Sequence, residues 1–97
     1  MIRSFADKGT ADIFDGIDSK PARKKCSQQL WNRARRKLDD INHARHHSDL
    51  RVPTSNNFHA LRGDRAGQWA IAINDQYRIC FRWEGTDAFD VEITDYH

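Results

Sequence analysis

Cysteine is scarce in this 97-residue chain, and its two cysteines do not form a recognisable motif. Cys26 and Cys80 lie far apart without CxxC spacing, so we expect neither a disulfide framework nor a zinc site. No apolar run approaches the length of a membrane span, and the first residues lack the apolar core of a signal peptide. These absences favour a reduced, cytoplasmic protein.

Motifs for nucleotides and cofactors are also missing. The chain has no Walker A phosphate loop, no GxGxxG dinucleotide motif and no GxSxG nucleophile elbow, so we expect no cofactor. Repeats, linkers and low-complexity tracts are absent as well. The length fits one domain, and we expect residues 1–97 to form it.

Charge is abundant but segregated along the chain. Charged residues make up 31% of the sequence, although the formal net charge is only +2. Residues 20–51 contain ten basic and three acidic side chains, whereas residues 84–97 contain five acidic and no basic ones. A block with a net charge of +7 can bind a polyanion through phosphate contacts and counterion release. A solvated helix face or a surface for an acidic partner is the alternative interpretation.

The first half of the chain predicts two helices after a short strand over residues 2–5. Asp7 is a plausible N-cap for a helix over residues 10–17, with Ile13, Phe14 and Ile17 facing inward. A longer helix is predicted over residues 21–42, capped by Ser19 or Lys20. Its apolar arc comprises Cys26, Leu30, Trp31, Ala34, Leu38 and Ile41. Its solvent face carries Lys25, Gln29, Arg33 and Arg36.

The second half of the chain changes to a period of two, which is typical of strands. Strands are predicted over residues 58–61, 68–73, 77–83 and 88–96. The fold class is therefore α+β, with two N-terminal helices packed on a small, mainly antiparallel sheet in the order β-α-α-β-β-β-β.

The register of the last three strands follows from keeping their apolar faces on one side of the sheet. Pairing Trp83 with Phe89 does this and implies a three-residue loop over residues 85–87. The same register places Arg78 opposite Thr94. Arg78 is then expected beside the last three residues, Asp95, Tyr96 and His97, which all carry proton-handling side chains.

Metal-independent RNA cleavage needs the residue types that this sequence supplies. A base takes the proton of the 2′-hydroxyl, an acid protonates the leaving 5′-oxygen, and cations stabilise the phosphorane. Histidine suits both proton roles and arginine suits the charge role. The candidates are His59, Arg62, Arg65, Arg78, Asp95, Tyr96 and His97.

Each candidate also has an ordinary structural interpretation. Arg78 is equally compatible with a surface arginine, although Arg82 is better placed to pair with Asp90. The last three residues are compatible with a frayed terminus. The histidines at 43, 46 and 47 lack ligand spacing, and we interpret them as solvated.

Three segments resemble one known family. Residues 59–69 (HALRGDRAGQW), 74–81 (NDQYRICF) and 95–97 (DYH) are similar to the HigB group of the RelE/ParE toxin superfamily, also called plasmid maintenance killer proteins. The resemblance spans the whole chain and is most specific from Leu50 onward. It implies a RelE-like fold, ribosome-dependent cleavage of mRNA, and inhibition by a HigA-type helix-turn-helix antitoxin.

The resemblance also assigns roles to individual residues. His59 and Asp95 match proton-handling positions, Tyr96 and His97 match C-terminal active-site residues, and Arg78 matches the arginine expected at the scissile phosphate. Arg62 stands where a relative can carry lysine. Arg65 lies in the matching turn, where stabilising the turn through Asp64 is the alternative role. We assign Arg62 and Arg65 to RNA binding, and the basic block of residues 20–51 adds Lys25, Arg33 and Arg36 to this group.

Two other functions remain open from the residues alone. A ParE-like gyrase poison would need neither the histidines nor the terminal Asp-Tyr-His. A plain RNA- or DNA-binding module would usually expose aromatic side chains for stacking on bases. Here the strand aromatics fall on the predicted core face, which favours the nuclease.

Overall fold

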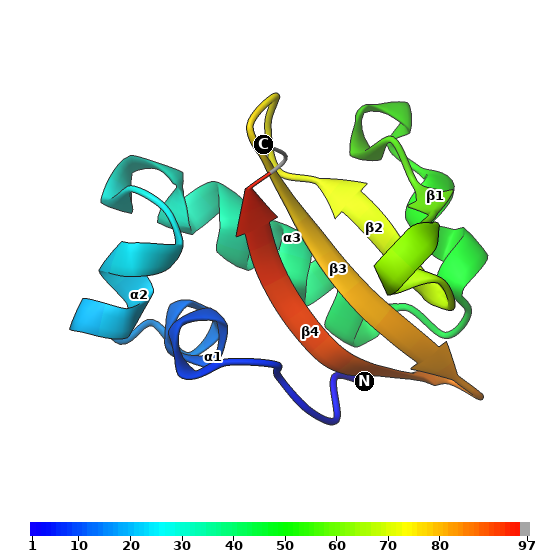
Figure 1. Ribbon diagram of the computed structural model, residues 1–97, viewed down its shortest axis with the longest axis horizontal. Coiled ribbons are helices and arrows are strands. Elements are labelled where there is room, and N and C mark those ends of the chain that lie inside the picture. The colour runs from blue at the N-terminus through cyan, green and yellow to red at the C-terminus, as the bar shows by residue number, and fades with distance from the viewer. Residues whose placement is uncertain (96–97) are drawn as a thin grey trace.

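The computed structural model describes residues 1–95 and contains three helices packed on a four-stranded sheet (Figure 1). The helices are α1 (Lys8–Asp15), α2 (Lys20–Lys25) and α3 (Trp31–His43). The strands are β1 (His59–Ala60), β2 (Gln68–Ala72), β3 (Tyr77–Glu84) and β4 (Asp87–Asp95). Short 3₁₀ turns are η1 (Gln28–Leu30), η2 (His47–Arg51), η3 (Thr54–Asn56) and η4 (Gly63–Arg65).

The sheet is antiparallel throughout, with the strand order β1-β2-β3-β4. The α3 helix lies behind it in Figure 1, and one hydrophobic core fills the space between helices and sheet. Fully buried members of this core include Leu38 and Ile41 of α3 and Ile79 and Phe81 of β3. The predicted α+β class is therefore confirmed.

Residues 2–5 do not form a separate strand. They run parallel to β4 and form two isolated bridges, Ile2 with Ala88 and Phe5 with Val91. The backbone N–H of Ile93, further along β4, donates to Thr10 Oγ1 at 3.1 Å. The outer edge of β4 is thus partly covered by the N-terminal segment and α1.

Both predicted helix caps are present. The Asp7 side chain accepts from the Thr10 backbone N–H at 2.7 Å, and Ser19 Oγ accepts from the Ala22 N–H at 3.1 Å. The inward position predicted for Ile17 is wrong. The α1 helix ends at Asp15, and the left-handed C-cap Gly16 turns the chain away, leaving Ile17 exposed.

The single helix predicted over residues 21–42 is wrong, because the chain breaks at Cys26. Cys26 has an extended backbone, and helix resumes only through η1 and α3. The Trp31 indole N–H donates to the Cys26 carbonyl at 3.0 Å, and both side chains are buried. The break lets α2 turn and pack on α1, where Gly9 provides the space.

The β3–β4 register is right in one half and shifted by one residue in the other. Arg78 lies opposite Thr94 as predicted, but Trp83 pairs with Ala88 instead of Phe89. A bulge near Asp90, whose φ is 54°, absorbs the extra residue. Phe89 consequently faces the Arg82 side of the sheet, with the guanidinium 5.3 Å from its ring centroid.

Candidate active site

The candidate site lies on the sheet face opposite the helices, which we call the outer face. Residues directly opposite one another in neighbouring strands share a face. One row across this face contains His59, Ala70, Cys80 and Glu92. The next row contains Ala72, Arg78 and Thr94. The sheet therefore places His59 and Arg78 on the same face.

The spacing between His59 and Arg78 follows from sheet geometry. They stand two strands apart and one row apart, so their Cα atoms are separated by roughly 12 Å. Two long side chains starting this far apart can approach one phosphodiester from opposite sides.

A backbone carbonyl fixes the ring of His59. His59 Nδ1 lies 2.7 Å from the Asn57 carbonyl oxygen, which can only accept a hydrogen bond. In the neutral ring Nδ1 therefore carries the proton, and Nε2 presents the lone pair. This tautomer leaves Nε2 as the nitrogen suited to proton transfer.

Arg78 is half-buried in the middle of the sheet, and its Nε donates to Thr94 Oγ1 at 3.4 Å. Asp95 follows Thr94 directly and accepts from Gln76 Nε2 at 3.1 Å. The strand register thus brings Arg78 next to the end of β4, as the alternation predicts. Asp95 itself lies opposite Tyr77, so the strand places it on the helix-facing side of the sheet, at the edge of the outer-face site. Tyr96 and His97 lie outside the described residues.

Arg65 crosses the outer face from η4. It donates to Gln68 Oε1 at 3.0 Å and to Glu92 Oε1 at 3.1 Å. Lys25 approaches the same carboxylate from α2, with Nζ 4.0 Å from Glu92 Oε2 and 2.9 Å from Asp7 Oδ2. Lys25 is therefore mostly buried in ion pairs, and its predicted place on an open solvent face is wrong.

An open pocket of about 390 Å³ lies where α2 meets the end of β4. It is lined by Lys24, Lys25, Arg65, Tyr77, Glu92, Ile93, Thr94 and Asp95. We call it the β4 pocket. Three cations and two carboxylates line it, so its lining has a net charge of +1.

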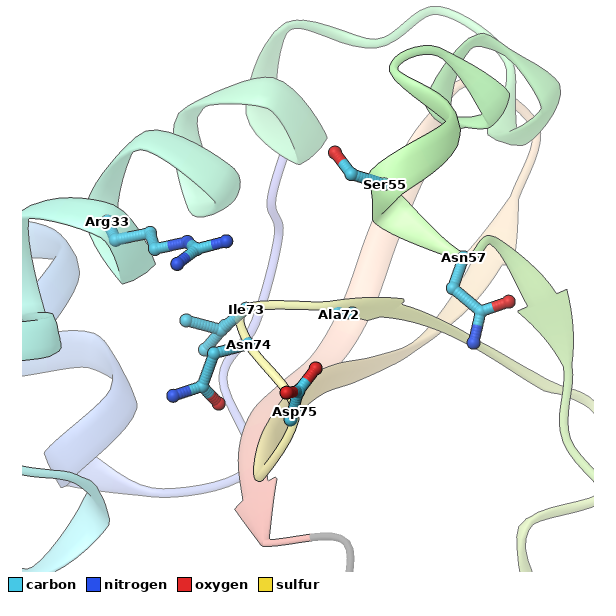
Figure 2. Close-up of a pocket in the computed structure, with 7 residues that line it drawn as sticks. All are labelled: Arg33, Ser55, Asn57, Ala72, Ile73, Asn74 and Asp75. Carbon is cyan, nitrogen blue, oxygen red and sulfur yellow. The ribbon is translucent and has the colours of Figure 1, made fainter.

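A second pocket, of about 470 Å³, opens on the β2 side of Arg78. Figure 2 shows its lining residues, which come from α3, the η3 region and the β2–β3 turn: Arg33, Ser55, Asn57, Ala72, Ile73, Asn74 and Asp75. Arg33 points into it from α3. Because Ala72 is opposite Arg78, this pocket and the β4 pocket lie on two sides of that arginine.

The exposed face of α3 carries the other predicted RNA contacts. Arg33 and Arg36 are exposed as predicted, whereas the neighbouring Arg35 donates to the Ile13 carbonyl at 3.1 Å. Arg62 is exposed at the start of η4. The predicted RNA-binding residues thus form two groups, one on α3 and one around the outer face.

His47 differs from the solvated histidine that the sequence predicts. Its ring stacks on Trp69 with centroids 4.3 Å apart, and its buried Nδ1 has no hydrogen-bond partner among residues 1–95. Burial lowers the pKa of His47, and the nearby His46 and Arg51 add to this effect. The ring holds η2 against the sheet.

Glu92 and Lys24 also line the β4 pocket but were not singled out from sequence. The acidic run after residue 84 contains Glu92, yet nothing local distinguishes it from its neighbours.

Within the described part of the chain, no three histidine, cysteine or acidic side chains gather as metal ligands. No helix of residues 1–95 is long and apolar enough to cross a membrane.

Two solved structures share the fold. YafQ from E. coli matches with a TM-score of 0.64 at 11% identity, over 99% of this chain and 92% of that one. The YoeB/ParE toxin from Agrobacterium tumefaciens matches with a TM-score of 0.55 at 13% identity, over 99% and 98% of the two chains. The chain therefore shares its fold with both of these structures.

Sequence comparison identifies the family. Residues 3–97 match the model of the RelE-like toxin of type II toxin-antitoxin system HigB. Toxin HigB-1 of Vibrio cholerae serotype O1 is 36% identical over 83 residues, covering 86% of this chain and 84% of the relative. Endoribonuclease HigB of Proteus vulgaris is 33% identical over 99 residues, covering both chains completely. The chain belongs to the HigB-like family of type II toxins.

Proposed function

We propose that this toxin is an endoribonuclease that cuts mRNA on the ribosome without a metal ion. The observation that carries the proposal is the shared sheet face of His59 and Arg78. Asp95 ends the adjacent strand one residue beyond Thr94, the partner of Arg78. The name of the Proteus vulgaris relative, an endoribonuclease, supports the same activity.

The proposed reaction is attack of a 2′-oxygen on the adjacent phosphorus. The 2′-hydroxyl loses its proton to a base, the bond to the 5′-oxygen breaks, and an acid protonates that oxygen. His59, Asp95, Tyr96 and His97 are the proposed proton-transfer residues. Arg78 stabilises the charge that develops on the phosphorane, because its planar donors match phosphate oxygens.

Basic residues on both sides of the site position the RNA. We propose that Arg62, Arg65 and Lys25 bind the RNA near the scissile phosphate. Arg33 and Arg36 bind phosphates of ribosomal RNA or mRNA that lie along α3. The toxin acts in the cytoplasm as one domain, and a HigA-type helix-turn-helix antitoxin inhibits it. Operator DNA is contacted only through the complex with that antitoxin.

The test compares Arg78→Ala with Arg82→Ala. Both arginines lie on β3 and face the same side, but Arg82 pairs with Asp90, away from the proposed site. Loss of one preorganised donor to the transition state slows catalysis by about 10²–10³-fold. We expect this loss for Arg78→Ala and near-wild-type cleavage for Arg82→Ala, measured on translating ribosomes by mapping new 5′ ends of mRNA.

Two outcomes would contradict the proposal. Full activity of Arg78→Ala would show that the site is misassigned. Wild-type protein that leaves ribosome-bound mRNA intact but blocks DNA supercoiling would establish a ParE-like gyrase poison instead. Thermal melting of both variants checks that the sheet is intact.

A further inference from the structure

A single carboxylate joins two of the cations assigned to RNA. Glu92 accepts from Arg65 Nη2 at 3.1 Å and lies 4.0 Å from Lys25 Nζ. The two cations come from η4 and α2, on opposite sides of β4. We propose that they form a phosphate-binding site for the RNA strand, which the Glu92 carboxylate occupies until a phosphate displaces it. This inference rests on the proposed function.

The cations do not depend on Glu92 for their positions. Arg65 also donates to Gln68 Oε1 at 3.0 Å, and Lys25 Nζ lies 2.9 Å from Asp7 Oδ2. Each therefore has a second partner that holds it at the pocket. Loss of the Glu92 charge would leave both cations in place with less of their charge neutralised.

The fit of Glu92 to this site is incomplete. Its distance to Lys25 exceeds that of a direct hydrogen bond, which for charged groups is about 2.7–2.9 Å. The side chain of Lys24 also lines the same pocket. The two charged oxygens of an RNA phosphodiester can accept from Arg65 and Lys25 together, because the group is not tethered to β4 as the Glu92 carboxylate is. An incoming phosphate therefore competes with Glu92 on favourable terms.

The position of the site relates it to the proposed chemistry. Thr94 lines the β4 pocket and also accepts from Arg78 Nε, so the pocket borders the arginine assigned to the scissile phosphate. A phosphate held by Arg65 and Lys25 would belong to a neighbouring nucleotide of the same strand. The Glu92 carboxylate consequently weakens the binding of any RNA at this site. RNA molecules that make additional contacts elsewhere on the toxin can still displace it.

The test is Glu92→Gln with Glu84→Gln as the matched control. Both variants remove one negative charge by the same chemical change. Glu84 pairs with Arg82 at the far end of the hairpin, and Arg82 keeps Asp90 as its partner. The probe is a short fluorescent single-stranded RNA carrying 2′-O-methyl groups, which cannot be cleaved by 2′-oxygen attack. Fluorescence anisotropy gives the affinity at a series of salt concentrations.

We expect Glu92→Gln to bind this RNA about three- to tenfold more tightly than wild type, from one repulsive charge removed near the phosphate. The slope of log affinity against log salt should steepen by about 0.7, the value for one more phosphate contact to a single strand. Glu84→Gln should match wild type in both measurements.

Three results would overturn the inference: no change in Glu92→Gln, an equal change in Glu84→Gln, or no RNA binding by any of the proteins. Cleavage on ribosomes by the same wild-type preparation separates this inference from the proposed function. If wild type cleaves mRNA but the RNA affinity of Glu92→Gln is unchanged, only the proposed phosphate site is refuted. If Glu92→Gln binds RNA more tightly but wild type does not cleave mRNA, only the proposed nuclease activity is refuted. Melting curves check that both variants remain folded.

Discussion

Gly9 is the position where the packing of α1 on α2 can be tested most directly. A Cβ added there would contact the Pro21 carbonyl oxygen and Lys25 Cγ, both well inside 3.0 Å. Gly9 lies in the first turn of α1, so alanine would gain up to about 1 kcal/mol of helix propensity. Overpacking of a tight contact costs about 1–3 kcal/mol, and here one neighbour is backbone and cannot rotate away.

The packing term therefore outweighs the propensity term. We expect Gly9→Ala to lower the free energy of unfolding by about 1–2 kcal/mol, taking the upper part of the packing range because two contacts are involved. For a chain of this length, that loss lowers the melting temperature by about 5–15 °C. Urea unfolding and thermal melts monitored by circular dichroism measure both quantities.

A double-mutant cycle identifies the contact responsible. Lys25→Ala removes Cγ but leaves the Pro21 carbonyl, so the cost of Gly9→Ala should shrink without vanishing in that background. A Gly9→Ala protein as stable as wild type, or more so, would refute the close approach of α1 and α2. The position of Lys25 beside Glu92 would then lose its structural basis.

Two further predictions concern pH. The hydrogen bond from Ser19 lowers the pKa of Asp12, with Lys8 adding to it, so this stabilisation is present above pH 3.8 and is lost as pH falls through the lower folded value. Asp12→Asn should be less stable than wild type at pH 7 and should lose less stability than wild type on acidification. Urea unfolding of both proteins at pH 7 and below pH 3.8 will show this. Burial lowers the pKa of His47 below 6.5, so the unfolded chain takes up its proton first and stability declines as pH falls through that value. His47→Phe, which keeps the stacking on Trp69, should flatten this decline between pH 7 and 5, and an unchanged slope would contradict the buried ring.

The periodicity of apolar residues predicts which side chains of a single strand face the core. The alternation over β2 and β3 places Ile71, Ile79 and Phe81 in the core, as expected from period two. It also predicts the pairing of Arg78 with Thr94, because a one-residue slip would turn Ile79 and Ile93 out of the core. The central part of the candidate site is therefore readable from the sequence.

Features that depend on contacts between distant segments were not predictable in this way. The helical period continues through Cys26, whereas in the structure the chain breaks there and α2 packs on α1, a contact between separate segments. The bulge at Asp90 likewise leaves no mark on the alternation. It places Ala88 instead of Phe89 on the core face, where Ala88 is fully buried next to the N-terminal segment.

The β4 pocket combines both kinds of information. Its cations belong to the basic block and to the η4 turn, which charge and family resemblance single out. Its carboxylate belongs to the acidic end of the chain, and only the sheet register and the turn of α2 bring it between them. Because cations from earlier in the sequence meet a carboxylate from its acidic end here, the small net charge of the chain understates how much the local positive charge rises when this one carboxylate is removed. The affinity of Glu92→Gln for RNA measures the effect of that added positive charge at the residue where the basic and acidic segments meet.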